Sequence, residues 1–176
     1  MLRITAVVSA AAVVLMVAGL LAQAKPNFTG KWTMEAPAAP AAPPAGAPAG
    51  GGGGGGRGGG RGGGGGWGME FTATQNATTL TIDYMAGGQA PAPVQFVVKL
   101  DGSESMNTPP GRGGAPGTPQ PSKAMWTGAT LVITTTTQAG ETKRVLSMDG
   151  ANLKIETTAP GFGGGAATTT TLTYKH

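Results

Sequence analysis

Apolar and polar residues alternate in short runs along most of the chain. An early run places Trp32 and Met34 on one face and Lys31 and Thr33 on the other, which is the period of two expected of a half-buried β-strand. No segment has the apolar spacing of an amphipathic helix. The pattern therefore predicts an all-β protein, with strands at residues 30–35, 67–74, 80–84, 94–100, 103–106, 124–126, 131–135, 144–148, 153–156 and 170–174.

Turn residues separate the predicted strands. Asp101-Gly102 and Asp149-Gly150 are dipeptides that accept the positive φ angles of a two-residue hairpin turn. The second strand of each predicted hairpin is also the first strand of the next one. A weak repeat of a turn followed by Leu-x-Ile supports one hairpin unit used several times, at residues 77–82, 128–133 and 150–155.

The longer links are rich in glycine and proline, and they are not scattered. In an antiparallel meander, alternate links lie at opposite ends. The tight turns then fall at one end, and the Gly/Pro-rich links, together with one short link at 138–141, fall at the other. This segregation favours an up-and-down meander of about eight to ten strands that closes into a barrel or curled half-barrel, with a closed base and a variable rim. The Gly/Pro-rich links are residues 36–66, 86–93, 108–121 and 159–167.

One face of the predicted strands should fill the barrel. The inward residues are predicted to be Trp32, Phe71, Leu80, Ile82, Phe96, Leu131, Ile133, Leu146, Leu153, Ile155 and Leu172. An outer-membrane barrel is the alternative architecture, but it needs strands of about 9 to 11 residues with an unbroken apolar outer band. The predicted strands are shorter, and their outer faces carry charged residues such as Glu70, Asp83 and Lys99. We therefore expect a water-soluble barrel.

The first 24 residues have the features of a secretory signal peptide. Arg3 precedes an apolar run, and Ala22 and Ala24 supply the small residues of a cleavage site. An uncleaved membrane anchor is the alternative, which the small residues make less favourable. We expect cleavage after Ala24, a single domain at residues 25–176 interrupted by low-complexity loops at 36–66 and 108–121, no transmembrane segment in the mature chain, and a periplasmic or secreted protein.

Composition excludes several kinds of chemistry. The chain has no cysteine for a disulfide, and its formal net charge of +4 is too small for a nucleic-acid-binding surface. Its single histidine, His176, cannot build a catalytic triad or a multi-histidine metal site. Acidic residues stand alone in predicted turns or on outer faces, so a catalytic carboxylate pair is not expected. The sequence predicts a non-enzymatic protein without a cofactor.

The opening of the predicted domain resembles a known motif. Phe28-x-Gly30-x-Trp32 resembles the start of the barrel in the calycin group, which comprises lipocalins, fatty-acid-binding proteins and avidins. Residues 26–32 are also similar to the start of secreted bacterial proteins that open with Pro-Asn-Phe-Ser/Thr-Gly-x-Trp. The resemblance implies a lipocalin-like barrel in which Trp32 plugs the base. It does not imply fatty-acid binding, because the arginine that fatty-acid-binding proteins place two residues before a tyrosine is missing before Tyr174.

Two functions fit this architecture. The leading hypothesis is binding of a small apolar or amphipathic ligand inside the barrel. Aromatic residues of a small barrel are more often core than ligand contacts, and both roles stay open for them. The candidate ligand contacts are Trp32, Phe71, Tyr84, Phe96, Trp126 and Tyr174.

The alternative is a structural or envelope-surface protein that acts through its rim. Arg57, Arg61 and Arg112 lie in the two longest Gly/Pro-rich links, which contain no acidic residue. Such a rim could attract an envelope glycan, a lipid headgroup or an acidic partner, although scattered arginines also serve solubility. Binding to RNA is not expected, because the Arg-Gly segment lacks interspersed aromatic residues and the protein is predicted to be exported. The pattern carries no information on oligomeric state.

Overall fold

The structure, a computed structural model, is an antiparallel meander of ten strands and confirms the predicted all-β fold. No helix in the part of the chain that it describes is long and apolar enough to cross a membrane. The predicted signal peptide lies almost entirely outside that part. The described residues are 24–36, 66–87, 91–111, 115–161 and 165–176. The strands are β1 (Gly30–Met34), β2 (Glu70–Gln75), β3 (Thr79–Ala86), β4 (Ala92–Lys99), β5 (Ser105–Asn107), β6 (Gln120–Thr127), β7 (Thr130–Thr137), β8 (Gly140–Asp149), β9 (Asn152–Ala159) and β10 (Thr168–Lys175).

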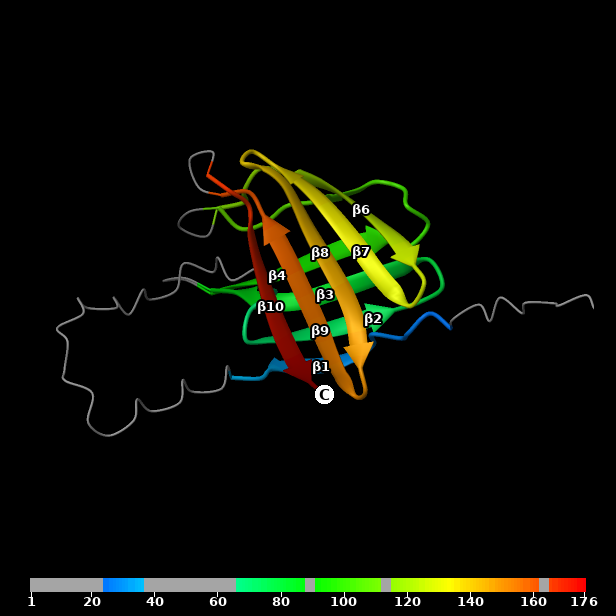
Figure 1. Cartoon of the computed structure of the whole chain (residues 1–176). Coiled ribbons are helices and arrows are strands. Elements are labelled where there is room, and N and C mark those ends of the chain that lie inside the picture. Colours follow the sequence, from blue (N-terminus) through cyan, green and yellow to red (C-terminus); the bar gives the residue numbers. More distant parts are fainter. Residues whose placement is uncertain (1–23, 37–65, 88–90, 112–114, 162–164) are drawn as a thin grey trace, which may run out of the picture.

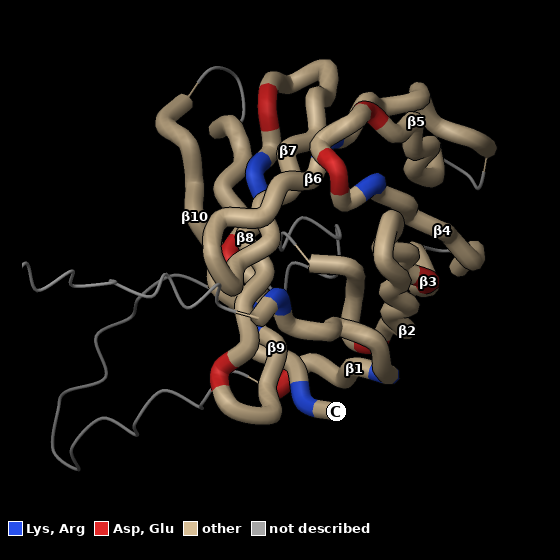
Figure 2. The backbone as a smooth tube through the Cα atoms, turned by 90° about the vertical axis from the view of Figure 1, so that its right-hand side faces the viewer, with Lys and Arg blue, Asp and Glu red and all other residues tan. Residues whose placement is uncertain are grey.

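The sheet curls into a nearly closed barrel. Its strand order is β4-β3-β2-β1-β10-β9-β8-β7-β6-β5, so the first and last strands of the chain are neighbours. The β1–β10 junction is short, with Thr33 opposite Lys175 and Met34 opposite Tyr174. Figure 1 shows β6 to β10 forming one side of the barrel with β1 to β4 crossing behind them, and Figure 2 shows the strands arranged as a ring.

The strand bounds differ from the predicted ranges by up to four residues at an end, and β5 and β6 are the two strands next to the predicted loop at 108–121. β5 covers Ser105–Asn107, and β6 begins at Gln120, inside a segment that its prolines and glycines predicted to be a loop. Pro121 fits because it lies before Ser122, where β6 first pairs with β7. At that point β6 has only β5 as a neighbour, and a residue without an N–H is tolerated on such an edge.

The predicted inner face is confirmed. Every predicted inward residue is buried except Leu172, which is half-buried and packs against the core. The structure adds aromatic residues to this core, because Phe28, Trp67 and Tyr174 are also buried. Ala73 and Ala124 belong to the same core.

The end of the barrel that carries the tight turns is closed by Phe28 and Trp32. Phe28 is fully buried and its ring stacks on Trp126, with the centroids 5.8 Å apart. Trp32 Nε1 donates to the Phe28 carbonyl at 2.9 Å. Gln75 fixes the segment from outside, because its Oε1 accepts from Phe28 N and its Nε2 donates to the Pro26 carbonyl. β1 therefore runs from a plugged base toward the rim, in the predicted orientation.

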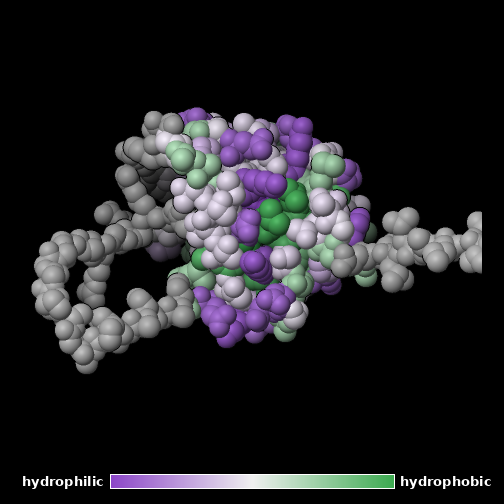
Figure 3. Space-filling view, viewed as in Figure 1, coloured by the Kyte–Doolittle hydropathy of each residue, from purple (hydrophilic) through white to green (hydrophobic). Residues whose placement is uncertain are grey.

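The outer face is mostly polar. Lys31 and Glu70 form an exposed ion pair at 3.2 Å across β1 and β2. One apolar row crosses three strands, since Met125 lies opposite Val132 and Val132 lies opposite Val145. Figure 3 shows a small hydrophobic area between hydrophilic residues on the side formed by β6 to β10.

Candidate functional site

The rim end of the barrel holds a cavity of about 910 Å³. The base is filled by Phe28 and the aliphatic core, whereas the cavity lies between the ends of the strands at the opposite end. Its volume falls within the range of about 300 to 1,000 Å³ that is usual for small-molecule sites. The barrel is therefore filled at its base and hollow at its rim.

One wall of the cavity is aromatic. Trp67, which precedes β2, is almost fully buried and contacts Phe71 edge-on at 5.5 Å and Phe96 at 5.7 Å between ring centroids. Tyr84 of β3 and Phe96 of β4 also line the cavity. Aromatic faces of this kind supply large apolar contact area to a ligand.

The facing wall carries a half-buried cation. Arg144 of β8 lies opposite Ile133 and Thr157, both of which are buried, so its side chain points into the barrel. Its guanidinium carbon lies 5.6 Å from the centroid of the Trp67 ring. Burial lowers the pKa of Arg144, and the nearby Tyr84 and Tyr174 oppose that shift. A guanidinium stays protonated in proteins, so the cavity contains a partly desolvated positive charge.

Tyr174 supports the aromatic wall from β10. Its ring contacts Phe71 edge-on at 4.9 Å, and its Oη donates to the Gly68 carbonyl at 3.0 Å. Burial raises the pKa of Tyr174 to about 12, and Arg144 partly offsets this effect. Gly66 packs directly on the Tyr174 hydroxyl, where no Cβ atom would fit. This contact holds the chain that leads into Trp67 against the barrel.

The lining of the cavity is suited to holding a molecule. Of the described residues that line it, Arg144 and Glu70 are charged, and Glu70 is turned outward to Lys31. No three His, Asp or Glu side chains in the described ranges gather where they would hold a metal ion. The polar side chains of Gln95, Asn107 and Thr135 in the lining already bond within the protein, to Asp83, Val97 and Ser122 respectively. The aromatic wall and the Arg144 guanidinium together fit a molecule with an apolar body and an anionic group.

A second, shallower hollow of about 380 Å³ lies along the outer side of β1 to β4. Its polar groups already bond to each other, because Gln95 Nε2 donates to Asp83 Oδ1 at 2.9 Å and Lys31 pairs with Glu70. The cavity at the rim is therefore the candidate site.

The structure divides the predicted aromatic contacts into two groups. Tyr84 and Phe96 line the cavity, and Phe71 and Tyr174 pack behind that lining. Trp32 and Trp126 lie at the plugged base, where Trp32 bonds to the Phe28 carbonyl and Trp126 stacks on the Phe28 ring. The predicted rim arginines, Arg57, Arg61 and Arg112, lie outside the described residues.

Two residues of the site were absent from the predicted set. Trp67 stands just before its strand, and an aromatic residue at the edge of a glycine run gives no sign of which way it faces. Arg144 shares the period-two face of Leu146 and Met148, which places it inward. An arginine on the apolar face of a strand is unusual, and this feature of the sequence could have identified Arg144 as a site residue.

Comparisons with known proteins do not place the chain in a family. No family model and no curated relative matches the chain. Among solved structures, the chain is similar to the fluorescent protein UnaG, both the wild type and a point mutant of it, with 19% and 20% sequence identity respectively and a TM-score of 0.43 for each. The alignments cover 61% of this chain and 71% and 70% of those two chains, respectively.

Proposed function

We propose that this protein is an exported, non-enzymatic binding protein that holds a small amphipathic anion in the rim cavity of its barrel. The observation that carries the proposal is the pairing of an aromatic wall with one half-buried, inward-facing arginine in a cavity of about 910 Å³. A barrel packed solid from base to rim would have contradicted it.

The charge of Arg144 selects the proposed class of ligand. A desolvated guanidinium interacts more strongly with an anion than one in water does, because the local dielectric constant is lower. Hydrogen bonds from a charged donor contribute about 1.5 to 3 kcal/mol. The apolar part of the ligand would lie against Trp67, Tyr84 and Phe96, which line the cavity.

Export is the proposed setting for this activity. The signal-peptide features of residues 1–24 support it. Intact-mass measurement of protein recovered from a periplasmic fraction should show a chain that begins at Lys25. Native mass spectrometry of the same material should reveal a retained small molecule, and a chain that still carries residues 1–24 would contradict the proposed processing.

Two fluorescent probes test the binding site. 1-Anilinonaphthalene-8-sulfonate carries an anionic sulfonate, and N-phenyl-1-naphthylamine has the same aromatic body without it. The substitution Arg144→Met should weaken sulfonate binding by roughly 10- to 100-fold, the equivalent of one charged hydrogen bond, and leave the neutral probe within about twofold.

The matched control is Lys143→Met, which removes the same charge from the adjacent, exposed position of β8. It should change the affinity of neither probe by more than about twofold. Equal loss of both probes in Arg144→Met, with a native circular dichroism spectrum, would overturn the assignment of the anionic group. Failure of 1-anilinonaphthalene-8-sulfonate to bind the unmodified protein would overturn ligand binding itself.

A further inference from the structure

The hydrogen-bonded ladder of the barrel is interrupted between β4 and β5, the two ends of the strand order. Side chains of β5 replace the backbone bonds there. Val97 N donates to Asn107 Oδ1 at 2.7 Å, and Asn107 Nδ2 donates to the Val97 carbonyl at 2.9 Å. Lys99 N donates to Ser105 Oγ at 3.1 Å. The side-chain amide of Asn107 thus acts as the missing peptide group of this seam.

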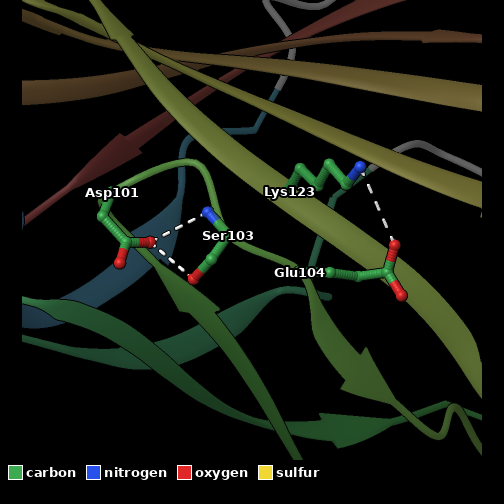
Figure 4. Close-up of polar contacts among 4 residues, drawn as sticks. All are labelled: Asp101, Ser103, Glu104 and Lys123. Carbon is green, nitrogen blue, oxygen red and sulfur yellow. Dashed lines mark hydrogen bonds and ion pairs between the residues drawn. The ribbon is translucent and has the colours of Figure 1, made fainter.

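The seam is held firmly at its base end. Asp101 Oδ1 accepts hydrogen bonds from Ser103 N at 2.8 Å and Ser103 Oγ at 2.6 Å, which fixes the turn between the two strands (Figure 4). Glu104, next to β5, forms an ion pair with Lys123 of β6 at 3.8 Å (Figure 4). β5 is therefore anchored to its turn and to β6, and a separation from β4 would begin at the rim end.

The rim end of the seam is also a wall of the cavity. Phe96 of β4 lines the cavity on one side of the seam, and Asn107, Pro109 and Pro110 line it on the other. Asn107 is buried and lines the cavity. Its side-chain amide also makes the hydrogen bonds of the seam that lie nearest the rim. Parting of β4 from β5 at Asn107 would open the cavity sideways.

We propose that the β4–β5 seam is a lateral gate, which parts at Asn107 to admit and release the ligand. The gate rests on the proposed function, since it serves the rim cavity. Its opening breaks three side-chain hydrogen bonds and leaves the ladder between β3 and β4 intact. Local openings of this size are the low-energy motions of a folded protein.

Hydrogen exchange tests the opening without any ligand. In an antiparallel strand, successive N–H groups point to opposite neighbours, so Val97 and Lys99 bond across the seam while Phe96 and Val98 face β3. The amides of Val97 and Lys99 should exchange at least tenfold faster than those of Phe96 and Val98. Equal protection of the two pairs would overturn the gate.

Cross-linking tests the passage of a ligand. The chain has no cysteine, so Val97→Cys with Met106→Cys places the only two thiols on the outer side of the seam, where a short bismaleimide can join them. The linked protein should bind and release 1-anilinonaphthalene-8-sulfonate at least tenfold more slowly, with an unchanged Kd, because a gate alters both rates equally. The control pair, Met125→Cys with Val132→Cys, joins strands that already share a ladder and should leave the rates unchanged.

The outcomes separate the two proposals. Normal probe affinity with rates within twofold of the unlinked protein would overturn the gate and leave the proposed function intact. Failure of the probe to bind the unmodified protein would overturn the proposed function and the gate with it. A slower rate in the seam-linked protein alone supports both.

Discussion

Phe28 should contribute a large share of the stability of the barrel, although it precedes the first strand. Its side chain is 0% exposed and stacks on Trp126 with ring planes 10° apart. Burial of a ring of about 150 to 250 Å² at about 25 cal/mol per Å² corresponds to about 4 to 6 kcal/mol. Measured Phe→Ala substitutions in cores cost about 3 to 5 kcal/mol. We therefore expect Phe28→Ala to lower the free energy of unfolding by about 4 kcal/mol.

The assay is urea unfolding followed by the fluorescence of Trp32 and Trp67, which both lie in the core. Phe28→Leu keeps most of the volume and should cost less than Phe28→Ala. A double-mutant cycle of Phe28→Leu with Trp126→Leu should give a coupling of about 0.5 to 1.5 kcal/mol for the stacked pair.

Met125→Ala is the control for this series, because Met125 is 64% exposed. It should change stability by less than about 0.5 kcal/mol. A Phe28→Ala protein that loses less than about 1 kcal/mol would refute the placement of this ring in the base of the barrel.

Three further predictions concern the junction of β10 with its neighbours. Burial raises the pKa of Tyr174 to about 12, above its ordinary value of 10.0, so the unfolded chain loses this proton first and stability should fall between pH 10 and pH 12. Tyr174→Phe should flatten the urea midpoint over that window, and an equally steep loss would contradict this assignment. Gly66→Ala should lower the thermal midpoint by several degrees, since its Cβ would strike the Tyr174 hydroxyl; an unchanged midpoint would argue against that contact. Lys175→Met removes the exposed ion pair with Glu35 and should cost less than about 1 kcal/mol, with the difference shrinking at high salt.

The strands could be predicted from the sequence because apolar and polar residues alternate within each of them. Leu131 and Ile133 alternate with polar or half-buried positions, and Asp149-Gly150 marks the following hairpin whatever lies around it. The segregation of long links to one end then gave the orientation of Phe28 and Trp32. These features are local or depend only on strand parity, so no three-dimensional information was needed.

The site depends on the register between strands, and this register could not be predicted from the sequence pattern. Arg144 reaches Trp67 because β8 and the segment before β2 meet across the barrel. Asn107 reaches Val97 because side chains of β5, in place of its backbone groups, make the hydrogen bonds to β4. Neither contact follows from the period of its strand, and turn residues do not distinguish a backbone ladder from a side-chain seam. For the same reason the aromatic residues could not be divided between the cavity and the base before the strands were aligned.

The pairing of β1 with β10 sets the order in which the barrel assembles. Every other junction in the strand order joins strands that follow each other along the chain, and most of these close small loops and form early. β1 and β10 come from opposite ends of the described domain, and the entropy of closing so large a loop places their junction late. The proposed export would move the chain across a membrane with its N-terminus first. β1 would then cross before all other strands and would remain without its partner β10 until the end of the chain had crossed. The junction of β1 with β10 is thus the last part of the barrel to form.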